Sequence, residues 1–447
     1  MRLCFKGSAV LAAVALGVFA CGGQPGNNAA SHLVKHPEVP SDSQAKCKVA
    51  KKQSEPLIVE WPDSARGKLE SMTKRGLVAV RYEGCELEVL SQCRVKGNYG
   101  YQPITRKQSR VTIKDEDDLY ASMPVGAVKL EGKPVTRVEN FCATGSEAMR
   151  QAAYAVASGA YDLVAAVGVE KVKDGGYQGL NGFPIPTDGT NRTLTAAAMF
   201  SLLLPAYAQK YGVDEDEIRK VVARIGSKNH HNGARNERAQ FRREMSAEQI
   251  CSMPAVAGRL AVMDCAGVAD GAAAVILCRA EDAYKYTDKP LFIKALSFVS
   301  GSGSGLVDPD FDFTTLPECE MAAKDAYHQA GVTDPRNEIA MAEVHDCFTV
   351  TELVLMEDLG FTDRGQAWKE VLEGAFDLTG DLPVNTDGGL KSFGHPVGAS
   401  GLRMLYEVWL QMRHEAPPER QITTTKKLGL THNLGGYPGE MVSFVGI

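Results

Sequence analysis

A cysteine between an expected strand and an expected helix is the first residue that could do chemistry. The alternation of residues Val135–Glu139 indicates a strand, an Ala-rich helix is expected through Ala157, and Cys142 lies between them. The amides and the positive end of a helix favour a thiolate, the form of cysteine that attacks a carbonyl carbon. A single cysteine is more often a small buried apolar residue, so its role depends on the other motifs.

Three further motifs carry histidines, a second thiol and glycines. His-Asp-Cys-Phe at 345–348 follows a buried strand expected to end at Val344, and functional groups gather at such carboxyl ends in open α/β sheets. Gly-His-Pro-Val-Gly-Ala-Ser-Gly occupies 394–401, and His-Asn-Leu-Gly-Gly occupies 432–436. Together these groups suit carbon–carbon bond chemistry on a thioester. A nucleophile would hold the acyl group, a base would move a proton, and N–H groups would stabilise an oxyanion.

Residues 135–447 resemble the thiolases, in the branch of the sterol-carrier-protein-type thiolases and the bacterial acetyl-CoA acetyltransferases. That branch has His-Asp-Cys-Phe where other thiolases have Asn-Glu-Ala-Phe, and His-Asn-Leu-Gly-Gly where others have Cys-x-Gly-Gly-Gly. Asp-Gly-Ala-Ala-Ala at 270–274 adds to the match. The resemblance implies an α/β thiolase fold, in which two βαβαβ halves stack with helices between their sheets.

The resemblance also implies a role for each motif. Cys142 would accept the acyl group, and His395 would take the proton from its thiol. His345 would fix the water of the first oxyanion hole. The backbone N–H groups of Cys142 and Gly435 would form the second oxyanion hole.

The second acid–base group is implied to be Cys347. Asn433 occupies the usual place of the second catalytic cysteine, so the exchange of a proton with the substrate α-carbon would pass to Cys347. Ala266 and Gly267 resemble the stretch beside the pantetheine arm of coenzyme A, where a backbone contact is expected. Asn433 and Gly436 are further expected substrate contacts.

The family pattern divides the matching part into a partial N-terminal half at 135–285 and a C-terminal half at 286–447. A polar insertion at about 174–250 would be the loop domain that covers coenzyme A, and its His230 and His231 are expected to be solvated. The C-terminal half has a complete set of expected elements: strands near 291–299, 339–345, 382–386, 427–433 and 440–446, and helices at 317–330, 349–359 and 400–412.

The N-terminus predicts a lipoprotein-type signal peptide over residues 1–21. Arg2 and Lys6 precede an apolar stretch at 7–20, which is too short to span a bilayer, and Cys21 would be lipidated. An ordinary secretory signal and a fortuitous apolar stretch are the alternatives.

The composition of the next residues predicts a flexible tether at 22–55 and a small lipoprotein-like α+β domain at 56–134. Its Cys85 and Cys93 could pair in an exported protein. The elements expected there are strands at 57–61 and 77–82 and a helix at 64–74.

The first thiolase half is expected to be truncated. A thiolase has two strand–helix units ahead of the strand that leads to its nucleophile, whereas here residues 1–134 precede that strand. A divergent first half, a genuine fusion and a mis-assembled gene are the alternatives. We favour a truncated thiolase joined to an unrelated lipoprotein fragment, which predicts an exposed sheet edge and puts activity in doubt.

Composition excludes several classes of protein. The chain of 447 residues is 44% apolar and 23% charged, which is typical of a globular protein of two or three domains. Its net charge is −6, with the excess of acidic residues after residue 134, so nucleic acid is not an expected partner. No cysteine spacing matches a structural zinc site and no Gly-x-Gly-x-x-Gly is present, so no metal is expected.

The expected function is that of a thiolase-type acyltransferase, which condenses acyl-CoA thioesters or cleaves a 3-oxoacyl-CoA through an acyl-cysteine. Coenzyme A thioesters would be substrates, with no bound cofactor. A homodimer or homotetramer is expected, with a small acyl-CoA-binding protein as an optional partner. The thiolase part belongs in the cytoplasm, whereas the signal would direct the chain to the membrane as a lipid-anchored protein. The alternatives are a thiolase-like steroid side-chain aldolase and a non-enzymatic envelope lipoprotein fusion.

Overall fold

A computed structural model describes residues 133–172, 195–439 and 441–447, together with the backbone of short strands outside these ranges. The chain divides into two units, one formed by Met1–Pro25 with Val138–Ile447 and the other by Gly26–Arg137. In the second unit, β2 (Cys47–Lys48) pairs with β3 (Ile58–Val59), and β4 (Ala79–Glu83) pairs with β5 (Glu86–Leu90). The expected helix at 64–74, Cys21, Cys85 and Cys93 lie outside the described residues. Within the described part, no helix is long and apolar enough to cross a membrane.

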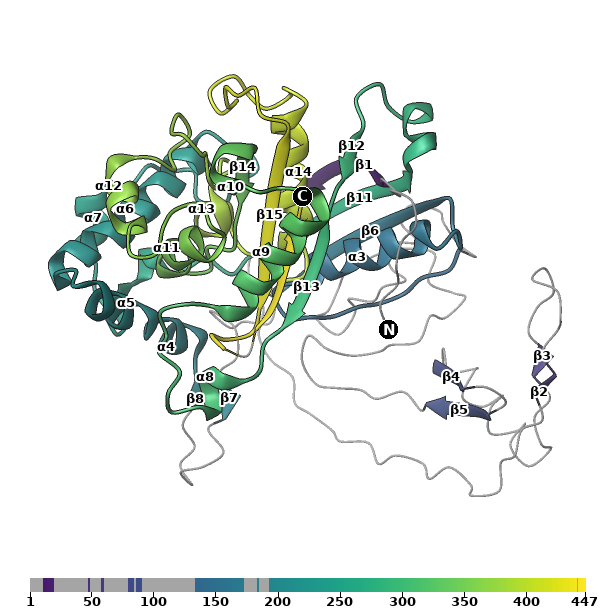
Figure 1. The fold of residues 1–447 in the computed structure, drawn as a ribbon, viewed down its shortest axis with the longest axis horizontal. Coiled ribbons are helices and arrows are strands. Elements are labelled where there is room, and N and C mark those ends of the chain that lie inside the picture. Colours follow the sequence, from purple (N-terminus) through teal and green to yellow (C-terminus); the bar gives the residue numbers. More distant parts are fainter. Residues whose placement is uncertain are drawn as a thin grey trace, which may run out of the picture. The chain divides into compact units, whose positions relative to one another are not determined.

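The sheet of the first half has the strand order β12–β1–β11–β6, with antiparallel pairs throughout (Figure 1). Its strands are β1 (Leu11–Phe19), β6 (Leu163–Glu170), β11 (Gly271–Arg279) and β12 (Leu291–Ile293). The stretch predicted to be the apolar part of a signal peptide is thus a strand of this sheet. Strand β6 ends the sheet among the described residues, and its Leu163 and Val167 are 46% and 42% exposed.

The sheet of the second half has the order β13–β16–β15–β14. Its strands are β13 (Leu296–Ser300), β14 (Ile339–Glu343), β15 (Leu428–Gly435) and β16 (Val442–Gly446). Strand β14 is parallel to β15 and buried along its whole length, so its carboxyl end delivers the following residues into the interior. Helix α9 (Pro317–Ala330) packs against β13 and β16.

Two helices lie between the sheets and contact each other: α3 (Thr144–Ala157) and α14 (Ser400–Met412). Their apolar faces share one core with both sheets, formed by residues such as Met149, Ala273, Leu402 and Phe444. Gly401 allows the close approach, since a Cβ atom there would collide with the Ser146 hydroxyl of α3. The starts of both helices, each next to a predicted catalytic residue, are therefore adjacent.

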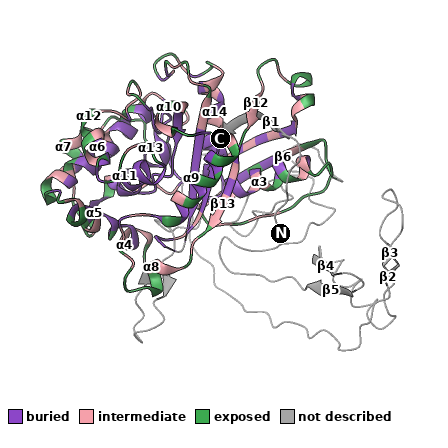
Figure 2. Cartoon of the chain, viewed as in Figure 1, coloured by how far each residue is buried: buried purple, intermediate pink, exposed green. Residues whose placement is uncertain are grey.

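A helical layer covers the carboxyl end of β14. It comprises α4 (Ala196–Phe200), α5 (Leu203–Tyr211), α6 (Glu215–Ala234), α7 (Ala247–Cys251), α11 (Thr349–Asp358), α12 (Ala367–Glu373) and α13 (Gly389–Phe393). Helix α11 directly follows the His-Asp-Cys-Phe motif at 345–348, and all its residues are buried (Figure 2). The short remaining elements are β7 (Phe183–Pro184), β8 (Thr193–Leu194), β9 (Ala255–Ala257), β10 (Leu260–Ala261), α8 (Ser304–Val307) and α10 (Pro335–Glu338).

Two expected strands are wrong. Residues Val135–Glu139 form no strand, and only the neighbouring Asn140 makes an isolated bridge, to Cys142. The 382–386 segment makes a single bridge from Val384 to Ala342. Backbone hydrogen bonds tie the 382–386 segment to Ala342 on one side and to Ala375 and Phe376 on the other, so its backbone is paired without forming a continuous ladder with one strand.

Candidate active site

Cys142 lies in a tight turn directly ahead of α3. The Ala143 amide donates to the Asn140 carbonyl at 3.0 Å, and the Thr144 amide donates to the Phe141 carbonyl at 3.1 Å. Phe141 has a φ of 49°, a left-handed conformation that costs energy for a residue with a side chain. The turn holds the thiol beside the N-terminus of α3.

The Cys142 thiol is harder to ionise than the sequence predicted. Its pKa is raised to about 12, first by burial and then by the carboxylates of Glu170 and Glu139. We expected the helix terminus to lower the pKa of Cys142 and so favour its thiolate, and this expectation is wrong. The free-energy cost of burying the thiolate exceeds the stabilisation that a helix N-terminus provides. Cys142 is therefore a neutral thiol near pH 7, and it would need a base to act as the predicted nucleophile.

His395 is placed to be that base. Its Nδ1 lies 2.7 Å from the Ser400 Oγ, and that hydroxyl donates its own hydrogen to the Pro396 carbonyl at 3.0 Å. Ser400 can then only accept, so Nδ1 of His395 carries the proton and Nε2 keeps its lone pair. Nε2 has no hydrogen-bond partner within the described residues. Burial lowers the pKa of His395 to about 4, so the ring is neutral near pH 7.

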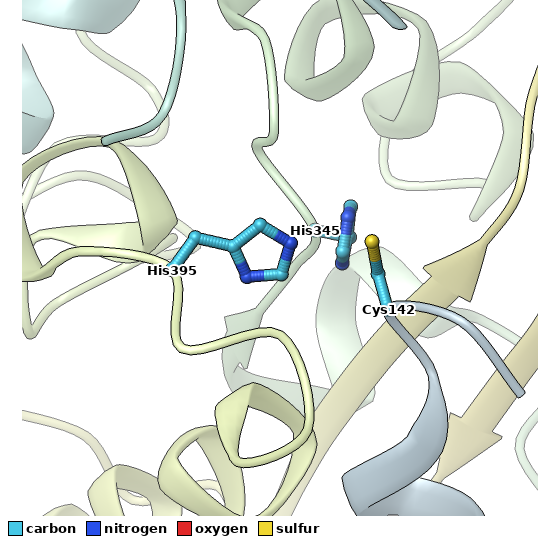
Figure 3. A group of neighbouring side chains, drawn as sticks. All are labelled: Cys142, His345 and His395. Atoms are coloured by element: carbon cyan, nitrogen blue, oxygen red, sulfur yellow. The ribbon is translucent and has the colours of Figure 1, made fainter. Parts of the chain in front are cut away.

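His345 follows β14 and meets both of these groups. It is fully buried, and its ring centroid lies 5.2 Å from that of His395 at an interplanar angle of 84°. Burial, followed by the neighbouring His395, lowers the pKa of His345 well below its ordinary value. One sulfur or nitrogen atom from each of Cys142, His345 and His395 lies within 4.8 Å of the other two. Figure 3 shows the thiol directed toward the His345 ring.

Cys347, the fourth predicted catalytic residue, is buried two positions beyond His345. Its Sγ lies 3.6 Å from the Thr351 Oγ1 in α11. Burial raises the pKa of Cys347 well above its ordinary value, and Cys142 lies close enough to raise it further. The structure therefore brings both thiols and both histidines of the predicted set into one region.

Asp346 fixes the turn between these residues, a role that the sequence did not indicate. Its carboxylate accepts hydrogen bonds from the Leu390 amide at 2.6 Å and the Lys391 amide at 3.1 Å, and from Asn229 Nδ2 at 2.7 Å. These contacts join the turn after β14 to α6 and to α13, the helix that precedes His395. The two histidine loops are thus fastened together by one buried carboxylate.

The segment 265–269 crosses both catalytic loops. The Ala266 amide donates to the Cys347 carbonyl at 2.8 Å, and the His395 amide donates to the Gly267 carbonyl at 2.8 Å. The Ala266 amide and the Gly267 carbonyl, in the segment expected to contact substrate, therefore hold Cys347 and His395 in place. The Ala266 carbonyl and the Gly267 amide are not part of these two bonds.

Gly435 ends β15 against the turn that carries Cys142. A Cβ atom at Gly435 would lie 3.0 Å from the Ala143 nitrogen and closer still to the Asn140 carbonyl oxygen, so only glycine permits this approach. The proximity is what an oxyanion hole formed by the N–H groups of Gly435 and Cys142 requires. Gly436 follows with a φ of 104°, which also favours glycine.

Asn433 and His432 are fully buried in β15. Asn433 Nδ2 contacts the Met404 sulfur at 3.8 Å, while its Oδ1 lacks a partner in the described part of the chain. His432 Nε2 lies 3.2 Å from the Ser443 Oγ and 3.3 Å from the Cys319 Sγ, and burial lowers its pKa to about 3. The His432 side chain therefore extends from β15 and contacts β16 and α9.

The expectation of solvated loop histidines is wrong for His230. Both His230 and His231 lie in α6, whose start is capped by the Asp214 carboxylate. His230 is 1% exposed, its Nδ1 lies 3.1 Å from the Arg243 carbonyl, and burial lowers its pKa to about 4. His231 lies 3.5 Å from the Glu244 carboxylate at the surface.

Comparison with known proteins agrees with this geometry. The family models "Thiolase, N-terminal domain" and "Thiolase C-terminal domain-like" match residues 116–281 and 307–445. The acetyl-CoA acetyltransferase of Methanothermobacter thermautotrophicus is 37% identical over 314 residues, which is 68% of this chain and 78% of the relative. Sterol carrier protein 2 of Homo sapiens is 32% identical over 320 residues, which is 68% of this chain and 57% of the relative.

Solved structures show the same fold. The Ltp2-ChsH2(DUF35) aldolase has a TM-score of 0.58 at 22% identity, over 69% of this chain and 78% of that one. Human mitochondrial 3-ketoacyl-CoA thiolase has a TM-score of 0.51 at 15% identity, over 72% and 82% of the two chains.

A cysteine beside a buried imidazole, held between two stacked α/β halves, suits acyl transfer through a thioester. The chain belongs to the thiolase family of acyltransferases. The N-terminal family model begins at residue 116, inside the range 56–134 that the sequence assigned to a separate small domain.

Proposed function

We propose that the protein transfers acyl groups between coenzyme A thioesters through an acyl-cysteine at Cys142. The observation that carries this proposal is the cluster of Cys142, His345 and His395, with one sulfur or nitrogen atom from each residue within 4.8 Å. Two acetyl-CoA acetyltransferases among the relatives, at 37% and 35% identity, favour acetyl-CoA or a short acyl-CoA as substrate.

The first half-reaction forms the acyl-enzyme. Nε2 of His395 takes the thiol proton, and the Cys142 sulfur attacks the thioester carbonyl. Collapse of the tetrahedral intermediate breaks the bond to the coenzyme A sulfur, which leaves with the proton held by His395. Both partners are neutral at rest, because burial raises the pKa of the thiol and lowers that of the imidazole. Charge therefore develops only when substrate is present.

Oxyanion stabilisation uses two groups of donors. His345 faces the nucleophile and would order a water at the thioester oxygen. The N–H groups of Cys142 and Gly435 would bind the oxygen of the acylated intermediate. A preorganised donor in such a site is worth about 3–4 kcal/mol of barrier lowering.

The second half-reaction needs another acid–base group, and Cys347 fills this role. In the condensation direction Cys347 first gives its own proton to His395, which is neutral again once coenzyme A has left, and the resulting thiolate removes the α-proton of a second acyl-CoA. The carbanion attacks the acyl-cysteine carbonyl, and the sulfur of Cys142 leaves and takes the proton back from His395. Thiolysis of a 3-oxoacyl-CoA is the reverse sequence.

Substrate, assembly and location complete the proposal. Coenzyme A thioesters act as substrates without a bound cofactor, and the chain forms a homodimer or homotetramer, with a small acyl-CoA-binding protein as a further partner. The thiolase part works in the cytoplasm. If the N-terminal signal is used, lipidation at Cys21 anchors the chain to the membrane instead.

Isotope exchange between labelled coenzyme A and acetyl-CoA tests the function without requiring condensation. Exchange in the absence of a second acyl acceptor is expected for the wild type and absent for Cys142→Ala. Cys251→Ala removes a partly buried thiol in α7 and serves as the matched control. Exchange that persists in Cys142→Ala would instead support the aldolase alternative. No exchange in folded wild type would support a non-enzymatic lipoprotein fusion.

A further inference from the structure

The catalytic cluster also has the composition of a metal site. Three elements remote in sequence supply its ligand atoms: the turn before α3 supplies Cys142, the end of β14 supplies His345, and the loop before α14 supplies His395 (Figure 3). One thiol and two imidazoles are ligands that a borderline cation such as Zn²⁺ prefers. Three protein ligands leave a fourth position for water.

The lone pairs of this cluster are free within the described residues. Neither ring nitrogen of His345 makes a hydrogen bond of ordinary geometry there, although the Asn433 side chain is a polar neighbour of the ring, and Nε2 of His395 has no partner. Both rings are at most 3% exposed, so bulk solvent reaches neither of them. Ser400 holds the proton of His395 on Nδ1 and so leaves Nε2 as the coordinating atom. A metal ligated by a histidine whose other nitrogen is hydrogen-bonded is the usual arrangement.

We propose that Cys142, His345 and His395 bind Zn²⁺ or a similar divalent cation, which blocks the nucleophile reversibly. Binding exchanges the sulfur–hydrogen bond of Cys142 for a sulfur–metal bond and releases one proton to solvent. Zinc bonds of about 2.0–2.3 Å place tetrahedral ligand atoms roughly 3.5 Å apart, so ligands now within 4.8 Å need a movement of about 1 Å. The ion is not a resident cofactor, and its binding can be measured without the transfer reaction.

Cobalt(II) titration of the full chain, without substrate, tests the site. The wild type is expected to bind one Co²⁺ with the visible bands of a tetrahedral ion and a sulfur-to-cobalt charge-transfer band. Cys142→Ser should lose the charge-transfer band, and His345→Ala or His395→Ala should weaken binding by more than about tenfold. Cys251→Ala should behave as the wild type.

A folded wild type without the charge-transfer band would overturn the proposal. So would a band that persists in Cys142→Ser or disappears in Cys251→Ala, since the ion would then be bound by other thiols. If a histidine variant does not fold, Cys142→Ser still decides, because it changes one atom of a partly buried side chain. Circular dichroism and thermal unfolding establish which variants are folded.

Discussion

Replacing Ser400 with alanine isolates the contribution of the His395 tautomer. The Ser400 Oγ accepts the Nδ1–H of His395 at 2.7 Å, and both side chains are buried. Loss of this acceptor leaves a buried N–H unpaired, at a cost of about 1–3 kcal/mol. Moving the proton to Nε2 relieves that cost but removes the lone pair needed to take the thiol proton from Cys142.

Because about 1.4 kcal/mol corresponds to a factor of ten in rate, Ser400→Ala should slow acylation of Cys142 by about 10–100-fold. The assay is single-turnover acylation by acetyl-CoA, followed by rapid quenching and mass spectrometry. Ser392→Ala is the matched control, since Ser392 is equally buried and its hydroxyl donates to the Phe241 carbonyl at 2.8 Å and not to His395. Unchanged acylation in Ser400→Ala, or equal slowing in both variants, would refute the tautomer argument.

Four further predictions address the second thiol, the oxyanion hole, pH and the N-terminal strand. Cys347→Ala should still acylate Cys142 but condense about 10²–10⁴-fold more slowly, and equal loss in both assays would contradict its role. Gly435→Ala should lower acylation by about 10²–10³-fold, because its Cβ would push the Cys142 turn away from the Gly435 N–H; a normal rate would show that acylation does not depend on this close approach. Acylation should not follow an ordinary histidine titration near pH 6.5, because the folded pKa of His395 is about 4. The unfolded state binds the His395 proton first, so the His395 contribution to the urea-unfolding free energy, taken as the difference between the wild type and His395→Gln, should fall as the pH drops from about 6.5 toward 4, and a rise in that difference would contradict the assignment. Deleting residues 1–20 should lower the thermal midpoint, because β1 pairs with both β11 and β12, and an unchanged midpoint would show that the strand adds no stability.

The elements most accessible from sequence were those with strong local signals. Helix α9 begins at Pro317 and ends at the left-handed Gly331, and α14 begins at the glycine-rich motif; both have the expected bounds. Strand β14 was predictable because a continuous apolar stretch ends at a polar motif. The strand predicted at Val135–Glu139 does not form, because alternation alone does not show whether a partner strand lies beside the segment.

In the site too, the sequence identified residues through local motifs but not through contacts between residues far apart in the chain. Motif residues identified the nucleophile and histidines, but the roles of Ser400 and Asp346 depend on which groups the fold brings within hydrogen-bonding distance. His230 was misplaced because a polar composition masks the burial of one face of α6. The direction of the Cys142 pKa shift also required the structure, because burial and the Glu170 carboxylate are long-range effects.

Acylation of Cys142 is the central claim, and intact-protein mass spectrometry after incubation with acetyl-CoA tests it most directly. One acetyl group should appear on the wild type, map to the peptide that contains Cys142, and be released by added coenzyme A. Cys142→Ala should show none, while Cys347→Ala should acylate normally. A folded wild-type chain without an adduct, or with its adduct on another cysteine, would contradict the assignment of Cys142 as the acyl carrier.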